Sequence, residues 1–313
     1  MAVGARLKRA TSRHHPRGCD RPAKDITLRG QAFETPDPLA MLAEKKLTTA
    51  KTSAFHPFGK AAGDGAMVKG TVKANGTVLR MKPDGSALEV YAWGPAEPVR
   101  PPVGAGREPL RLRERPQGAG HPPIANAPDC VWKVKPGAWY GWPDYFGGEP
   151  VADPKFRSTE GPAPEFLMKD HPPVEKPLLC LPPHVSPCHV EFARGGTFGP
   201  AGRMYLAAFG DLAPTTAAKQ ERAGYCVYRI DPATGAAETF SRAKAAALGP
   251  KDLEYVTTAG PRRPVGVRFA PAGDALYVAD IGPLHFTRSA TGPTPRPFPE
   301  AGTLWRISRA AAR

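Results

Sequence analysis

Short apolar runs bounded by glycine, proline and aspartate recur along most of this chain. Turn residues of this kind end each run before a helix could form, and the pattern is typical of a meandering antiparallel sheet. It predicts strands at residues 77–81, 87–92, 130–134, 204–209, 226–230, 265–269, 276–279 and 303–307. Helical periodicity is confined to 38–46 and 241–248, where short turns of helix are expected. We therefore expect an all-β fold.

Three of the predicted strands share one pattern: a small residue, two bulky residues, an arginine and an apolar residue. The copies are Thr77-Val-Leu-Arg-Met81, Cys226-Val-Tyr-Arg-Ile230 and Thr303-Leu-Trp-Arg-Ile307. The first two enter a Pro/Asp/Gly turn and return as strands at 88–91 and 237–240. Repeated hairpins indicate radially repeated sheets, so we expect a β-propeller, with a β-sandwich as the alternative. The arginines are 149 and 77 residues apart (229−80 and 306−229), which leaves room for long loops or extra blades.

Composition agrees with turn-rich β structure. The 313 residues include 39 prolines and 33 glycines, which disfavours long helices. Lys and Arg number 43 against 29 acidic residues, a net charge of +14. The arginines concentrate in 1–22 and 95–123, without aromatic residues between them that could stack on bases. We therefore expect a solvated basic surface and no nucleic-acid partner.

The five cysteines are Cys19, Cys130, Cys180, Cys188 and Cys226, and none forms a Cys-x-x-Cys pair. Their spacing allows a disulfide but does not identify its members. No run approaches the roughly 18 apolar residues of a membrane-spanning helix, so we expect no membrane span. The first ten residues are basic and lack the apolar stretch of a secretory signal.

Four aromatic residues gather between glycines and prolines in the segment 135–150: Trp139, Tyr140, Trp142 and Tyr145. Glycine and proline prevent a helix here and produce a shaped loop. Aromatic faces on such a loop can grip a flat cofactor or a sugar ring. The alternative is an aromatic corner that packs between strands.

The loop, with several other segments in the same order, resembles the soluble quinoprotein glucose/sorbosone dehydrogenase family, most closely its sorbosone-dehydrogenase-like branch. The resemblance runs from Asp25 to Ile307, with 95–121 excepted. Its most specific parts are Val68–Gly76, Pro123–Asp129, Trp139–Pro143, Leu181–His184, Ala208–Asp211 and Arg263–Phe269.

The resemblance implies a six-bladed propeller that holds pyrroloquinoline quinone (PQQ) and Ca²⁺ at the blade tops. In the family, a histidine takes the proton of the substrate hydroxyl while hydride passes to the quinone. Tyr140 and Trp142 match the aromatic pair on the substrate side of the cofactor. His184 matches a histidine of the relatives, and Asp129 matches an acidic position that is a candidate Ca²⁺-associated carboxylate. The alternatives are a buried imidazole that fixes a loop and an ordinary turn cap.

The segment 95–122, rich in proline, arginine and glycine, departs from the family. Relatives follow a strand like Glu89–Gly94 with Leu-Arg-Asn-Pro-Phe-Gly, whose Arg-Asn pair grips the quinone. The codons CCT-GCG-GAA-CCC-GTT-CGG-CCT would encode Pro95 to Pro101, and the same string read one base later would encode that motif. We therefore predict a frameshifted segment at about 95–121, with a disordered surface insertion as the alternative. Sequencing the gene tests this, because the prediction requires a single-base slip near codon 95.

In the family, the catalytic histidine lies in an earlier blade, and nothing before Asp25 resembles that blade. No catalytic residue is therefore identified in this chain. We expect 1–24 to be an unstructured or spurious tail and 25–309 to be three to four C-terminal blades of a propeller. The expected function is that of a PQQ-dependent sugar or aldehyde dehydrogenase-like protein that is inactive or weakly active. A Ca²⁺-dependent propeller lactonase and a non-catalytic binding propeller are the alternatives.

The partners implied by the resemblance are a sugar substrate and an electron acceptor. Open sheet edges of a partial propeller would also favour self-association. Relatives act in the periplasm or outside the cell, whereas this chain shows no signal peptide, so the compartment stays open.

Overall fold

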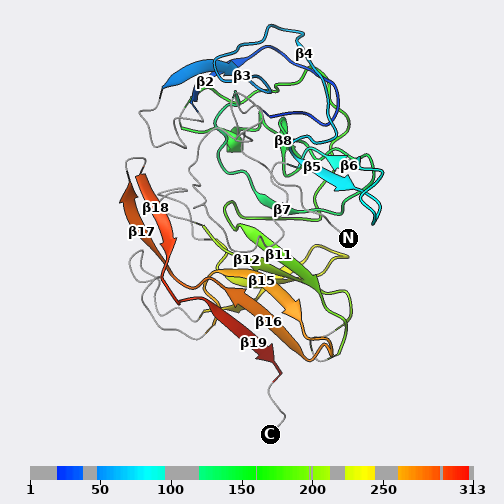
Figure 1. The fold of residues 1–313 in the computed structure, drawn as a ribbon, viewed down its shortest axis with the longest axis vertical. Coiled ribbons are helices and arrows are strands. Elements are labelled where there is room, and N and C mark those ends of the chain that lie inside the picture. The colour runs from blue at the N-terminus through cyan, green and yellow to red at the C-terminus, as the bar shows by residue number, and fades with distance from the viewer. Residues whose placement is uncertain are drawn as a thin grey trace. The chain divides into compact units, whose positions relative to one another are not determined.

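The computed structural model describes residues 20–37, 48–95, 120–159, 161–196, 198, 200–211, 223–243, 260–289 and 292–309 (Figure 1). They form two compact units. Unit 1 takes in the described residues of Met1–Pro98, Glu114–Pro128 and Trp132–Pro177, and unit 2 those of Asp129–Val131 and Leu178–Arg313. These residues hold β-strands and one short 3-10 helix but no α-helix, which confirms the expected all-β class. No helix among them is long and apolar enough to cross a membrane.

Unit 1 is built from antiparallel ladders of two short strands each. The pairs are β1 (Ile26–Thr27) with β4 (Met67–Val68), β2 (Ala32–Pro36) with β3 (Thr49–Ser53), β5 (Thr77–Arg80) with β6 (Glu89–Trp93), and β8 (Tyr145–Phe146) with β9 (Glu149–Pro150). The 3-10 helix η1 (Pro154–Phe156) follows them, and Asp153 caps it by accepting a hydrogen bond from the Lys155 N–H. Two-stranded ladders are marginal alone, so side-chain packing must hold this unit together.

Unit 2 contains longer strands in larger antiparallel sheets. A four-stranded sheet has the order β11 (Pro187–Phe192), β12 (Met204–Ala208), β13 (Cys226–Ile230), β14 (Ala237–Arg242). A three-stranded sheet has the order β15 (Pro264–Phe269), β16 (Ala275–Asp280), β19 (Thr303–Ser308). Two further ladders pair β17 (Leu284–Ser289) with β18 (Gly292–Pro297) and β7 (Asp129–Val131) with β10 (Leu179–Leu181).

The two larger sheets are copies of one another over three strands. β11 and β15 share the pattern Pro-x-x-Val-x-Phe, and both have a β-bulge directly after the proline. In the next two strands, Tyr205 lies opposite Arg229 in one sheet and Tyr277 opposite Arg306 in the other. β14 has no counterpart among the described strands of the second sheet. Residues of both sheets share one buried cluster, which includes Tyr205, Val227, Val267, Phe269, Leu276 and Val278.

A disulfide joins Cys130 and Cys180, which lie directly opposite one another in the β7–β10 ladder with their Cα atoms 4.2 Å apart. The structure thus identifies the pair that spacing alone left open. Cys188 and Cys226 are reduced thiols, and Cys19 lies outside the described residues.

All eight strands expected from the apolar runs are present, with ends shifted by a few residues. Of the helical turns, 38–46 lies outside the described residues. The expectation that a turn begins at Ser241 is wrong, because Ser241 and Arg242 pair with β13 as the end of β14; 244–248 lies outside the described residues. Propeller closure, the number of blades and the domain limits remain predictions, as does the frameshift, since 96–119 also lies outside the described residues.

Candidate functional site

The aromatic loop of unit 1 is fixed at a glycine with an unusual backbone conformation. Gly141 has φ +108°, and a Cβ atom there would lie 2.6 Å from the Cβ of Tyr145. Only glycine fits this position without displacing its neighbour. The Gly141 carbonyl accepts hydrogen bonds from the N–H groups of Asp144 and Tyr145, at 2.9 and 2.8 Å, and so closes the turn. A cis peptide bond joins Trp142 to Pro143.

The end of β6 positions this loop. The Trp93 carbonyl accepts a hydrogen bond from the Tyr140 N–H at 2.9 Å, and the Gly94 carbonyl accepts one from the Trp142 N–H at 2.7 Å. A side chain at Gly94, which has φ +79°, would collide with the indole of Trp139. Only glycine therefore fits at position 94, where the end of β6 meets the aromatic loop.

Three rings on the loop are buried within unit 1. Trp139, Tyr140 and Trp142 expose 1%, 3% and 5% of their surface. The Tyr140 hydroxyl donates to the Lys133 carbonyl at 3.0 Å and accepts from the Lys135 N–H at 2.8 Å. Burial raises the pKa of this hydroxyl above its ordinary value. The Tyr140 hydroxyl is thus hydrogen-bonded to backbone groups, as is usual for a buried tyrosine with a structural role.

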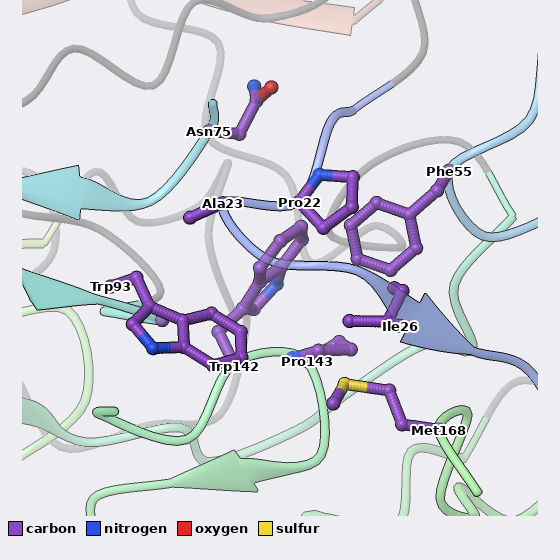
Figure 2. Close-up of a pocket in the computed structure, with 10 residues that line it drawn as sticks. Pro22, Ala23, Ile26, Phe55, Asn75, Trp93, Trp142, Pro143 and Met168 are labelled. Carbon is purple, nitrogen blue, oxygen red and sulfur yellow. The ribbon is translucent and has the colours of Figure 1, made fainter. Parts of the chain in front are cut away.

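Trp142 borders a small apolar cavity (Figure 2). The space open to the centre of a water molecule is about 10 Å³, which is room for roughly one water. Figure 2 shows the rings of Phe55, Trp93 and Trp142 around this space, with Met168 on another side. The lining residues are Pro22, Ala23, Ile26, Phe55, Asn75, Trp93, Gly94, Trp142, Pro143 and Met168. Asn75 contributes a side-chain amide to this lining, and the rest of the wall is largely hydrocarbon.

A buried His–Asp pair lies against Trp142. The imidazole of His121 stacks on the indole with ring centroids 5.2 Å apart, and its Nε2 lies 3.8 Å from the Asp20 carboxylate. That separation is too long for a hydrogen bond, and Nε2 has no hydrogen-bond partner among the described residues. Burial raises the pKa of Asp20 to about 7 and lowers the pKa of His121 to about 4. Near neutral pH, His121 is therefore an uncharged imidazole.

A second buried carboxylate, Asp144, holds the loop to a distant segment. Its two oxygens accept hydrogen bonds from the N–H groups of Leu167 and Met168, at 2.7 and 3.0 Å. Burial outweighs these bonds and raises the pKa of Asp144 to about 6. In the same region, His171 stacks on Trp139 with ring centroids 5.3 Å apart.

The other two residues singled out from the sequence, Asp129 and His184, lie in unit 2. The Asp129 carboxylate accepts a hydrogen bond from the Ser186 N–H at 3.0 Å. His184 and Ser186 both have left-handed backbone conformations, with φ +64° and +51°. Asp129 therefore caps the turn that carries His184, and these two residues belong to one local structure.

The four candidates thus fall into two pairs, Tyr140 with Trp142 in unit 1 and Asp129 with His184 in unit 2. The described ranges contain no group of three or more His, Cys, Asp or Glu side chains that could hold a metal ion. Sequence reasoning missed Asp20, His121 and Asp144, whose partners are 23 or more residues away along the chain. No family model matches the chain, and no curated protein matches its sequence.

Proposed function

We propose that this chain is a sugar or aldehyde dehydrogenase-like protein of the soluble quinoprotein type, and that it is inactive or weakly active. The observation that carries the proposal is the copied sheet of unit 2, in which the arginine strand recurs at the same place beside a tyrosine of the preceding strand. Repeated antiparallel sheets that share a core support a propeller, and the quinoprotein type rests on the resemblance of the sequence segments. The implied partners are a sugar substrate and an electron acceptor.

The described residues do not fit PQQ. A fused three-ring quinone needs an open aromatic face, whereas Tyr140 and Trp142 are buried and the cavity beside Trp142 has room for about one water. The Asp129 carboxylate already binds the Ser186 N–H, and it is placed as a turn cap. We therefore assign no catalytic step to the quinone or to Ca²⁺ in this chain.

The test is reconstitution of the purified protein with PQQ and Ca²⁺, followed by melting and by turnover of glucose and other sugars with a dye acceptor. We expect an unchanged melting temperature and a rate far below the roughly 1–10³ s⁻¹ of ordinary enzymes. Turnover in that range, lost in a Trp142→Ala variant that remains folded, would show that the loop does hold the quinone. The proposal of inactivity would then be wrong.

A non-catalytic binding protein is the alternative that one observation favours. Among the described strands, β19 forms the end of its sheet, and edge strands readily add another polypeptide, a second copy of the same chain included. Binding of a protein ligand without any PQQ-dependent shift in melting would separate this alternative from the dehydrogenase proposal.

A further inference from the structure

The arginine of the repeated strand has the same partner wherever the following strand is present. In unit 1, Arg80 lies opposite Glu89 of β6, and its Nε is 2.5 Å from the glutamate Oε1. In unit 2, Arg229 lies opposite Glu238 of β14, and the two charged groups are 2.7 Å apart. The two copies are 149 residues apart, yet the pair and its register are conserved between them (229−80).

An aromatic ring two residues beyond the glutamate completes the arrangement. The guanidinium carbon of Arg80 lies 4.9 Å from the ring centre of Tyr91, and that of Arg229 lies 5.8 Å from the ring centre of Phe240. Both are cation–π distances. The strand that follows an arginine strand therefore reads Glu-x-aromatic. This pattern occurs twice in the 313 residues, at Glu89 and Glu238, and both copies are already paired.

The third arginine strand, β19, offers the same groups without that neighbour. Arg306 lies opposite Tyr277 of β16, as Arg229 lies opposite Tyr205 of β12. No described strand pairs with the other edge of β19. Leu304 is 68% exposed, and the Arg306 side chain is 52% exposed. Its contacts to Asp274 and Ser308, at 3.4 and 3.3 Å, are longer than the glutamate pairs of the other two copies.

We propose that the outer edge of β19 is a docking site for an extended peptide strand of the pattern Glu-x-Phe or Glu-x-Tyr. The peptide would add antiparallel as the fourth strand, in the place that β14 has in the other sheet. Its main chain would satisfy the open N–H and C=O groups of β19, and Arg306 would select the glutamate. This inference does not depend on the proposed dehydrogenase function.

The side-chain charge of β19 favours binding of a separate peptide rather than a second copy of this strand. β19 reads Thr-Leu-Trp-Arg-Ile-Ser and contains no acidic residue. Pairing of two β19 strands would therefore bring another arginine to the edge and no carboxylate. Like charges on neighbouring strands destabilise a sheet, whereas opposite charges stabilise it.

The probe for the test is the chain's own fourth strand, a fluorescein-labelled peptide Ala-Ala-Glu-Thr-Phe-Ser-Arg that copies residues 236–242. Fluorescence anisotropy with the full chain should show saturable binding. A control peptide with lysine in place of the glutamate should bind about fivefold to tenfold more weakly, the size expected when an exposed ion pair becomes a repulsion. Hydrogen exchange should slow at β19 on binding and stay unchanged at β13, which is already paired on both sides.

Variants of the protein assign the effect to Arg306. Arg306→Glu should reverse the preference, so that the lysine peptide binds better than the glutamate peptide. Arg296→Glu, which changes the same charge at an exposed position of β18, should leave the preference unchanged. Equal binding of both peptides, no protection at β19, or no effect of Arg306→Glu would overturn the proposal. A concentration-dependent dimer that excess peptide fails to dissociate would assign the edge to a second copy and would also overturn it.

Discussion

The two units use different means to hold similar short strands in place. In unit 1 the ladders have two strands each, and the order comes from a cluster of buried side chains rich in aromatic rings. In unit 2 the strands are longer, pair into larger sheets and repeat one side-chain pattern. A regular sheet distributes its stability over many equivalent contacts, whereas a loop-rich unit concentrates it in a few residues.

The largest effect should follow from Trp139→Ala in unit 1. This indole is almost fully buried and packs on Trp93, Tyr145 and His171, so its loss should lower the free energy of unfolding by about 3–5 kcal/mol. Trp305→Ala removes a half-buried indole from the edge strand β19 of unit 2 and should cost less. Urea unfolding followed by circular dichroism measures both. Equal losses would remove the contrast between the units.

Breaking the disulfide should have the next largest effect, and in unit 2. The Cys130–Cys180 bond closes a loop with a sequence separation of 50 residues, so the double variant Cys130→Ala/Cys180→Ala should lose about 2–4 kcal/mol. The matched control Cys188→Ala removes a thiol that is not in a disulfide and should cost less than about 1 kcal/mol. A double variant as stable as the control would show that the bond adds nothing to the short β7–β10 ladder.

The pH dependence of unit 1 should change when either member of its buried pair is removed. The pKa of Asp20 is raised to about 7, so its contribution to stability is complete below about pH 4 and is lost as pH rises through 7. The pKa of His121 is lowered to about 4, so its contribution is complete above about pH 6.5 and is lost as pH falls through 4. Between these limits the two slopes oppose one another.

Two variants separate these slopes. Relative to the unmodified chain, Asp20→Asn should become more stable as pH rises from about 4 to 7, because the stability that Asp20 loses over this range is removed from the comparison. His121→Gln should become less stable relative to the unmodified chain from about pH 4 to 6.5, because the stability that His121 gains over this range is absent. Asp144, with a pKa raised to about 6, contributes equally to all three proteins and cancels in the differences. Profiles that stay parallel to that of the unmodified chain would contradict the assignment.

The smallest effect should be the same in both units. Arg80→Ala and Arg229→Ala each remove an exposed ion pair, and each should cost about 0.2–1 kcal/mol. The Arg–Glu pair occurs at the same strand register in both units, so it does not account for the difference in how the units are stabilised. A loss several times larger in one variant, measured by urea unfolding, would mean that the pair itself distinguishes the two units.

The sequence predicted the parts of the fold that repeat. The pattern around Arg80, Arg229 and Arg306 located three strands and two hairpin returns because neighbouring strands impose the same alternation each time. The strand β11 was not predicted, because its Pro-x-x-Val-x-Phe pattern is recognised only by comparison with β15. The aromatic loop was recognised, yet the direction of its rings depends on β6 and on segments distant in sequence.

The buried pair and the disulfide could not be predicted for a related reason. Asp20 and His121 are 101 residues apart (121−20), and neither lies in a local motif that signals the other. The cysteines gave several equivalent pairings until the β7–β10 register placed Cys130 against Cys180. Local patterns specify strands, whereas contacts across the chain follow from tertiary packing.

The position of that disulfide has a consequence for proteolysis. The chain leaves unit 2 after Val131 and returns at Leu178, so the bond joins the two strands on either side of the whole segment that carries the aromatic loop. A protease that cuts anywhere between Cys130 and Cys180 would leave the two fragments covalently linked. Such a nicked molecule would keep its full mass on a non-reducing gel and separate into two bands only after a reductant is added.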